Sequence, residues 1–409
     1  MIDVNLDVND QHENAMAWLT AMEALTALGV QRQTLYANVS RGRIRAKPDP
    51  KDPRRSLYDG GDVKRLAGRG GGRRTVAAIA AETIGWGDPV LASSLSTVAD
   101  GRLIYRGRDA VELAKDATLE EVASLLWDAE ARFEPAPPAA KGAPASPLHA
   151  ALVALAERAA VDPPSAGRSR AALAKEGGDL IGALAAAMLG PQAGADAALH
   201  RRMARAWRAR RAEDGLRRAL VLLADHELNA STFAARVAVS TGAPLAAGLI
   251  AGLAALSGPL HGGAVASVRA LIAAARRATA EAAARDWLAQ GRKLPAFGHP
   301  LYPNGDPRAA ALLQRFAPRP LFEETRAAIE ELTGEAPNVD FALAAFADAY
   351  DLPAAAPFTI FAIARSVGWI AHAIEQALSG NLIRPRARYV GPAPILPREA
   401  GEADRPKLA

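Results

Sequence analysis

Alanine dominates the apolar residues of this chain, and this restricts the folds open to it more than any other feature. Half of the 409 residues are hydrophobic, but only 5% are aromatic. Alanine is the strongest helix former, whereas sheets favour β-branched and aromatic side chains. From Thr75 onward, nearly every segment places its apolar residues at helical spacing. Composition and periodicity therefore predict an all-α body of closely packed helices.

The charged residues are unevenly distributed. Residues 31–74 hold 13 Lys and Arg against four Asp, whereas the first 30 residues hold five acidic residues and no Lys or Arg. A secretory signal begins with basic residues before an apolar stretch, so we expect no such signal and a cytoplasmic location. The longest apolar stretch, 243–256, is too short to span a bilayer, and the one near Ile360 is interrupted by Arg365, so no membrane segment is expected. The chain has no cysteine, which excludes disulfides and thiolate sites.

Local signals near the N-terminus predict a small separate domain. Thr20 and Glu23 have the spacing of a capping box, so a helix is expected to begin there and to end at Gly29. A second helix is expected over 32–40. A β-hairpin and a third helix around Val63 are expected to follow it.

The expected hairpin pairs 43–46 with 56–58, and it is rich in basic residues. Helix, glycine turn, second helix and basic hairpin together resemble the winged helix-turn-helix modules of the MerR and excisionase type. The resemblance implies a DNA-binding domain over 17–67, after a disordered segment 1–16 and before a flexible basic linker 68–74. In such modules the second helix enters the major groove and basic side chains neutralise phosphates. The implied DNA contacts are Gln31, Arg32, Gln33 and Thr34 on the helix, and Arg43, Arg45, Arg54 and Arg55 on the wing. The alternative is a helical adaptor whose basic face is solvated or contacts another protein.

Three of the seven histidines lie in loop or glycine-containing contexts, where the backbone can approach a ligand closely. They are His226 in ADHELNAS, His261 in SGPLHGGA and His299 in AFGHPLYP. His12, His149 and His200 are expected at the surface, and His372, on an apolar helix, is expected to be structural. No metal-ligand spacing, nucleophile elbow or phosphate-binding loop occurs, so no metal site is expected.

One isolated aspartate and three arginines accompany these histidines. They are Asp340 in PNVDF, Arg308 in GDPRA, Arg365 in AIARSVGW and Arg384 in IRPRARY. Arginines bind dicarboxylates through bidentate hydrogen bonds, and a carboxylate can abstract a weakly acidic proton. Neutral histidines can donate hydrogen bonds to oxygens on which negative charge develops. These residue types therefore suit proton abstraction and condensation on a dicarboxylate.

The order of the motifs ADHE, PLHGG, FGH with DPRA, PNVD, ARSVGW and IRPR resembles that of the citrate synthase family over about residues 75–395. The resemblance implies a large helical domain over 75–260 and 346–409, and a small one over 261–345. It implies a homodimer that binds oxaloacetate and an acyl-CoA, with CoA as a product and no resident cofactor. The implied catalytic residues are His261, His299 and Asp340. The implied oxaloacetate ligands are His226, Arg308, Arg365 and Arg384, the last reaching in from the other subunit.

The resemblance also implies a role for each catalytic residue. Asp340 would remove a methyl proton from the acetyl thioester, and His261 would donate a hydrogen bond to the thioester oxygen. A helix expected to begin at 262–264 would hold His261 neutral through its positive end. His299 would polarise the oxaloacetate ketone, and the glycines around His261 would act as hinges for domain closure.

The sequence departs from the family pattern in three places. Val265 stands where many members have Asn, and Pro300 where many have Arg. An acidic residue, Glu335, stands where a basic contact to CoA is common. These differences leave the catalytic set intact but put the affinity for acyl-CoA in doubt. Three functions remain open: a citrate synthase, a 2-methylcitrate synthase that accepts propionyl-CoA, and a DNA-binding regulator with a synthase-like sensor body.

Overall fold

The computed structural model describes residues 18–28, 35–36, 38–39, 44–50, 52–63, 91–136, 146–191, 198–262, 264–387 and 389–392, without the side chains of 53–55 and 264. The chain divides into two compact units: Met1–Val90 with Ala387–Ala409, and Leu91–Arg386. The predictions for 1–16 and 68–74 lie outside the described residues. So do those for Gln31, Arg32, Gln33, Thr34 and Arg43, and for the side chains of Arg54 and Arg55.

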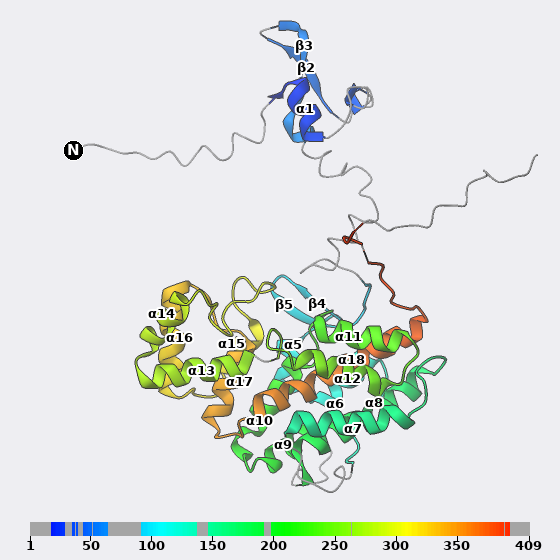
Figure 1. Cartoon of the computed structure of the whole chain (residues 1–409), viewed down its shortest axis with the longest axis vertical. Coiled ribbons are helices and arrows are strands. Elements are labelled where there is room, and N and C mark those ends of the chain that lie inside the picture. The colour runs from blue at the N-terminus through cyan, green and yellow to red at the C-terminus, as the bar shows by residue number, and fades with distance from the viewer. Residues whose placement is uncertain are drawn as a thin grey trace, which may run out of the picture. The chain divides into compact units, whose positions relative to one another are not determined.

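The first unit contains α1 (Ala21–Leu28) and an antiparallel sheet ordered β1-β3-β2, built from β1 (Trp18–Leu19), β2 (Ala46–Asp49) and β3 (Asp52–Asp59) (Figure 1). The predicted capping box is confirmed, because Thr20 N donates to Glu23 Oε2 at 2.8 Å and Glu23 N donates to Thr20 Oγ1 at 3.4 Å. A small core packs the helix on the sheet; it consists of Ala24, Leu28, Leu35, Ile44, Tyr58 and Val63.

The predicted hairpin forms, but its predicted boundaries were wrong. Pairing begins with Ala46 opposite Tyr58 and continues to Asp49 opposite Asp52. The strand β1, with two residues, pairs with the end of β3 and is too short to show an alternating pattern. The strand β1 joins the sheet by pairing with Tyr58 and Asp59, about 40 residues later in the chain. Local sequence signals do not encode a contact over that separation.

The second unit is mostly helical, which confirms the predicted all-α class. The sequence analysis did not predict a small antiparallel sheet at its start. This sheet has the order β4-β5-β6, from β4 (Ser96–Ala99), β5 (Arg102–Tyr105) and β6 (Arg108–Asp109). Positive φ angles at Asp100 and Gly101 form the first turn. An Asp-Gly pair between alternating residues is a strong hairpin signal, so the sequence did contain the information.

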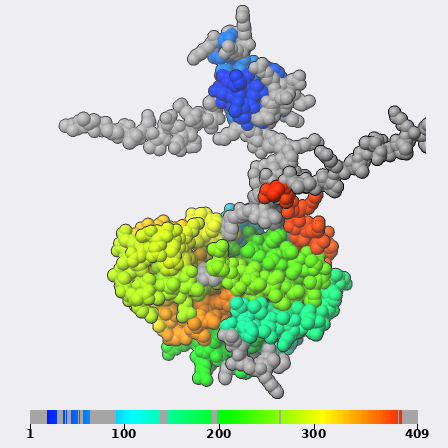
Figure 2. Space-filling model, viewed as in Figure 1, coloured from blue at the N-terminus to red at the C-terminus, as the bar shows by residue number. Residues whose placement is uncertain are grey.

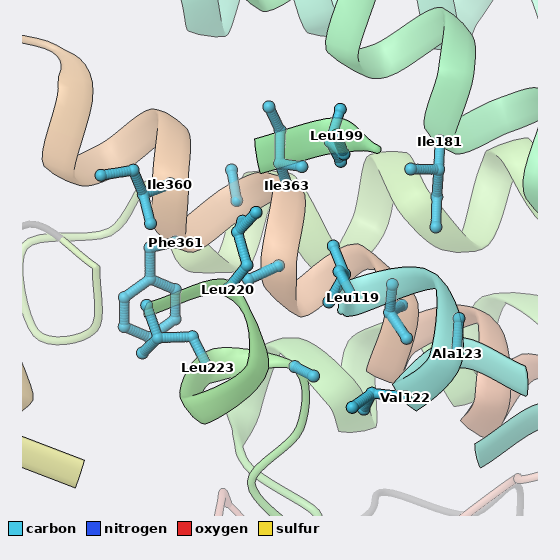
Figure 3. Packing of buried hydrophobic residues seen from close by; sticks show 14 of the residues in the cluster. Leu119, Val122, Ala123, Ile181, Leu199, Leu220, Leu223, Ile360, Phe361 and Ile363 are labelled. Atoms are coloured by element: carbon cyan, nitrogen blue, oxygen red, sulfur yellow. The ribbon is translucent and has the colours of Figure 1, made fainter. Parts of the chain in front are cut away.

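The larger of two hydrophobic cores surrounds α18 (Ala356–Ser379), which lies against α6, α8, α10, α11 and α12. The other helices around this core are α5 (Ala110–Asp116), α6 (Leu119–Trp127), α7 (Pro147–Val161), α8 (Arg170–Leu189), α9 (Leu199–Ala206), α10 (Glu213–Leu223), α11 (Ala230–Ser240) and α12 (Leu245–Leu256). Figure 3 shows side chains of α6, α8, α9, α10 and α18 gathered around a shared interior. The helix α18 is long and apolar enough to cross a membrane, but 94% of its most apolar window is buried inside the fold, as in a core helix.

The smaller core lies among α13 (Ala264–Arg277), α14 (Ala280–Ala289), α16 (Pro320–Thr333) and α17 (Val339–Ala349). In Figures 1 and 2 these helices lie to one side of α11 and α12. The helix α17 belongs to both cores, because Phe341 packs into the smaller core and Leu343 into the larger one. α15 (Pro307–Leu313) contributes Leu312 to the larger core. The N-terminal end of α17, which carries Asp340, therefore lies where the two cores meet.

Candidate active site

The three loop histidines reach the site from separate segments of the second unit. His226 lies between α10 and α11, His261 lies just before α13, and His299 lies between α14 and α15. His226 and His299 face each other edge to face, with ring centroids 5.2 Å apart. A tyrosine that the sequence analysis missed, Tyr302, completes this group. Its hydroxyl lies 2.9 Å from His226 Nε2, and its ring centroid lies 4.9 Å from that of His299.

His299 is held in one tautomer by its own loop. The backbone N–H of Leu301 donates to His299 Nδ1 at 3.2 Å, so that nitrogen is the acceptor. Burial, followed by the charge of Arg308, lowers the pKa of His299 to about 4. A neutral ring with an acceptor Nδ1 carries its proton on Nε2, so His299 has one free N–H donor.

His261 is bound to a serine that the sequence analysis also missed. Its Nε2 lies 2.9 Å from Ser231 Oγ, which in turn accepts a hydrogen bond from Trp369 Nε1 at 3.2 Å. Burial and then Arg365 lower the pKa of His261 to about 4. The ring is therefore neutral, as the sequence predicts.

Asp340 lies in the first turn of α17, and Asn338 is the N-cap of this helix. The side chain of Asn338 accepts a hydrogen bond from Asp340 N at 3.0 Å, and Asn338 N donates to Ala296 O at 2.9 Å. The second bond ties the start of α17 to the loop that carries His299. Asp340 Oδ1 is inaccessible to solvent and has no hydrogen-bond partner in the described part of the chain. Burial raises the pKa of Asp340 to about 6, and the positive charges of Arg308 and Arg365 only partly offset it.

Arg308 forms a bidentate ion pair with Asp306, two residues before it in the chain. Arg308 Nε and Nη2 donate to the two carboxylate oxygens of Asp306 at 2.9 and 2.8 Å, and both side chains are buried. Asp306 also caps α15 and accepts from Val339 N, at the start of α17, at 3.0 Å. The Asp-Pro pair at 306–307 is a helix-start signal that could have revealed this residue. Asp306 thus links Arg308 to the helix that carries Asp340.

Arg365 lies on α18 and is 1% exposed. Its Nε donates to Leu223 O at 2.9 Å, and its guanidinium lies 4.9 Å from the ring centroid of Phe361, which also contacts His261. Among the described residues, Arg365 Nη2 is buried without a hydrogen-bond partner. Burial lowers the pKa of Arg365 to about 10, so it remains charged at neutral pH. The site therefore holds an unpartnered cationic N–H group and an unpartnered carboxylate oxygen.

A buried polar network supports the loop that carries His226. The carboxylate of Asp225 accepts hydrogen bonds from Ser96 Oγ and from His372 Nε2, the latter at 3.3 Å. Gly368 of α18 packs directly on this loop. A Cβ atom added at Gly368 would lie 2.3 Å from Asp225 Oδ1, which is too close for a side chain at this position. His372 is therefore a structural histidine, as the sequence predicts.

Two other sequence predictions lie away from this site. His149 is exposed as expected, but His200 is buried, which corrects its predicted surface position. The reason is that α9 contributes Leu199 and Met203 to the larger core. Arg384 is exposed beyond α18, so one chain does not bring it together with the other six candidate residues. The described residues contain no group of three His, Asp or Glu that could hold a metal ion.

In the first unit, Arg45 directly precedes β2 and forms ion pairs with acidic residues. Its Nε donates to Asp62 Oδ2 at 2.8 Å, and its Nη2 lies 3.0 Å from Asp59 Oδ2. Lys47 lies over the ring of Trp18, at 4.1 Å from the centroid. Arg45, a predicted DNA contact, is thus already paired within its own unit.

Comparison with known proteins identifies relatives of this chain. The chain is 41% identical over 200 residues to putative citrate synthase 2 of Mycobacterium tuberculosis, covering 45% of this chain and 53% of the relative. It is 35% identical over 185 residues to 2-methylcitrate synthase 2 of Corynebacterium glutamicum, covering 42% and 48%. The chain thus matches about half the length of these curated relatives. The crystal structure of citrate synthase from Thermotoga maritima matches with a TM-score of 0.61 and 25% identity, covering 78% of this chain and 98% of that one. The family model for the citrate synthase C-terminal domain matches residues 136–386, which is more than half of the chain, so the chain belongs to the citrate synthase family.

Proposed function

We propose that the chain condenses acetyl-CoA with oxaloacetate and hydrolyses the product to citrate and CoA. The observation that carries this proposal is the state of Asp340: a carboxylate oxygen buried without a partner, with a pKa of about 6. A general base works best when its pKa lies near the working pH, because it is then both ionised and basic. Asp340 meets that condition, and the charges of two buried arginines, Arg308 and Arg365, act on it.

In the first step, Asp340 takes a proton from the methyl group of the acetyl thioester, and the C–H electron pair becomes an enolate. His261 donates a hydrogen bond to the thioester oxygen as negative charge builds on it. In the substrate-free chain the Ser231 hydroxyl donates to Asn229 Oδ1 at 2.7 Å and lies 2.9 Å from His261 Nε2. For His261 Nδ1 to be the donor, this hydroxyl must turn from Asn229 and donate to Nε2 instead. Because the pKa of His261 is about 4, its ring stabilises the oxygen as a hydrogen-bond donor without being a strong acid.

In the second step, the enolate carbon attacks the ketone carbon of oxaloacetate. The C=O electron pair moves to the ketone oxygen, where His299 Nε2–H donates a hydrogen bond. The proton that Asp340 took returns to this oxygen through solvent, which forms the hydroxyl of citryl-CoA and regenerates the base. The carboxylates of oxaloacetate pair with Arg365, whose Nη2 is unpartnered, and with Arg308, which Asp306 orients. Water then cleaves the citryl thioester and releases CoA as a thiol. The reaction requires no resident cofactor.

We place Arg384 in the active site of the partner subunit of a homodimer. This position is supported by its exposure beyond α18. A C₂ dimer would form two such shared sites. We also expect the protein to act in the cytoplasm.

A 2-methylcitrate synthase is the second candidate, because one of the relatives reported above carries that name. The two reactions differ by one methylene of the acyl group, which a pocket discriminates by about 1–3 kcal/mol. The ratio of kcat/KM for acetyl-CoA and propionyl-CoA decides between them. A ratio above one favours the citrate synthase, and a ratio below one favours the alternative.

DNA binding by residues 17–67 is a further proposed property, supported by the basic composition of 31–74 and by the wing-like hairpin β2–β3. The pairing of Arg45 with Asp59 and Asp62 weakens this proposal. A regulator that uses the body only as a sensor would bind oxaloacetate without turnover.

Thiol release in the presence of acetyl-CoA and oxaloacetate tests the main proposal. We expect release only when both substrates are present. Replacing Asp340 with Asn or His299 with Ala should each lower kcat about 100-fold or more. The matched control is Asp116→Asn, at an exposed aspartate outside the site, which should keep full activity. Near-normal turnover by Asp340→Asn would refute the assigned chemistry.

A further inference from the structure

The contact between Tyr302 and His226 determines which nitrogen of His226 faces the substrate. The Tyr302 hydroxyl and His226 Nε2 are 2.9 Å apart, and the two residues are 2% and 8% exposed. The Tyr302 ring is fixed by its contact with His299 and by Arg308, whose guanidinium lies 5.3 Å from its centroid. Neither ring is free to turn away without disturbing these contacts.

Both partners of this hydrogen bond are neutral at physiological pH. Burial raises the pKa of Tyr302 to about 12, although Arg308 opposes the rise. Burial, followed by Arg308 and Arg365, places the pKa of His226 well below its ordinary value. Tyr302 therefore has one O–H to donate, and His226 has one N–H and one acceptor nitrogen.

Only one arrangement of these two protons satisfies the buried phenol. Among the described residues, His226 Nε2 is the single hydrogen-bond partner of the Tyr302 hydroxyl. If Nε2 carried the imidazole proton, the phenol proton would be buried without an acceptor, which is unfavourable. The phenol must therefore donate to Nε2, and the imidazole proton must lie on Nδ1.

We propose that Tyr302 is a positioning residue, which holds His226 in the Nδ1–H tautomer so that Nδ1 donates to a carboxylate oxygen of the bound dicarboxylate. The identity of the substrate in this inference rests on the proposed function. The tautomer of His226 does not, because it follows from the contact with Tyr302 alone. In the other tautomer, the free nitrogen would present a lone pair to the anionic oxygen and would repel it. His226 and His299, 5.2 Å apart, are thus fixed in opposite tautomers by Tyr302 and Leu301 N.

The tautomer is tested by ¹⁵N NMR of the full-length protein labelled with ¹⁵N-histidine, without substrate. Protonated and unprotonated imidazole nitrogens have well-separated ¹⁵N shifts, and a His226→Gln sample assigns the signals. We expect the wild type to show a protonated Nδ1 at residue 226. In Tyr302→Phe we expect the Nε2–H form to appear, while the signals of His299 remain. A wild-type His226 protonated on Nε2 would overturn the proposal, whatever the activity of the enzyme.

The substrate part is tested by kinetics with the same variant. Loss of one hydrogen bond to a carboxylate of the substrate corresponds to a rise of about 10-fold or more in KM for oxaloacetate. KM for acetyl-CoA and kcat should each change by less than about threefold, because Tyr302→Phe keeps the ring that contacts His299 and removes only the hydroxyl, which bonds to His226. The control is Tyr350→Phe, at the far end of α17, which also removes a hydroxyl and keeps the ring. An unchanged KM for oxaloacetate in Tyr302→Phe would show that the hydroxyl does not position a substrate ligand.

Discussion

Replacing Asp340 with Asn should abolish catalysis and at the same time stabilise the protein. The pKa of Asp340 is about 6 in the folded chain, against 3.8 for an unperturbed aspartate. Because the folded pKa is the higher one, the native state favours the protonated carboxyl, and ionisation costs stability as the pH rises. The two pKa values correspond to about 3 kcal/mol at full ionisation. About half of this cost is present at pH 5, and all of it is present at pH 8.

Asn has nearly the same shape and carries no charge, so Asp340→Asn removes this cost. We expect the free energy of unfolding at pH 8 to rise by up to about 3 kcal/mol, and Tm to rise by several degrees. The gain should shrink to about half at pH 5. The assay is thermal and denaturant unfolding of wild type, Asp340→Asn and the exposed control Asp116→Asn at both pH values. An equal or lower stability of Asp340→Asn at pH 8 would show that the carboxylate is not destabilised by burial.

The same pKa predicts the pH dependence of the enzyme. The base must be ionised, so kcat/KM should fall about tenfold per pH unit below about pH 6. Replacing Gly368 with Ala places a Cβ 2.3 Å from Asp225 Oδ1, so we expect it to destabilise the protein by about 1–3 kcal/mol in denaturant unfolding and to lower activity through the loop beside it. Co-expression of the inactive variants Asp340→Ala and Arg384→Ala should restore activity in proportion to heterodimer formed; heterodimers shown by mass to be inactive would contradict a shared site. Binding of the full chain to duplex DNA should weaken steeply with salt, and the absence of binding at low salt would favour the adaptor function for 17–67.

Much of this protein was determined by local sequence. The helices of the body follow from alanine content and apolar spacing, because helix propensity and amphipathic periodicity act within a few residues. The capping box at Thr20 and Glu23 is encoded in the same local way. The Asp-Gly turn at residues 100–101 is local too. It predicts the hairpin β4–β5 when this turn signal is given more weight than the helical spacing of the segments around it. The candidate site residues were found because their residue types and order resemble a family, and not because the sequence shows their proximity.

Only the tertiary structure decided the state of those residues. The pKa of Asp340 is set by burial where two cores meet, and by Arg308 and Arg365, which lie far from it in the chain. The positioning residues Ser231 and Tyr302 have no distinctive local signal, since a hydroxyl acts here only through the histidine that folding brings to it. Desolvation and hydrogen bonding between distant segments depend on packing. The sequence by itself therefore determined which chemical groups are present, and the fold decided their charge, their tautomer and which other groups they contact.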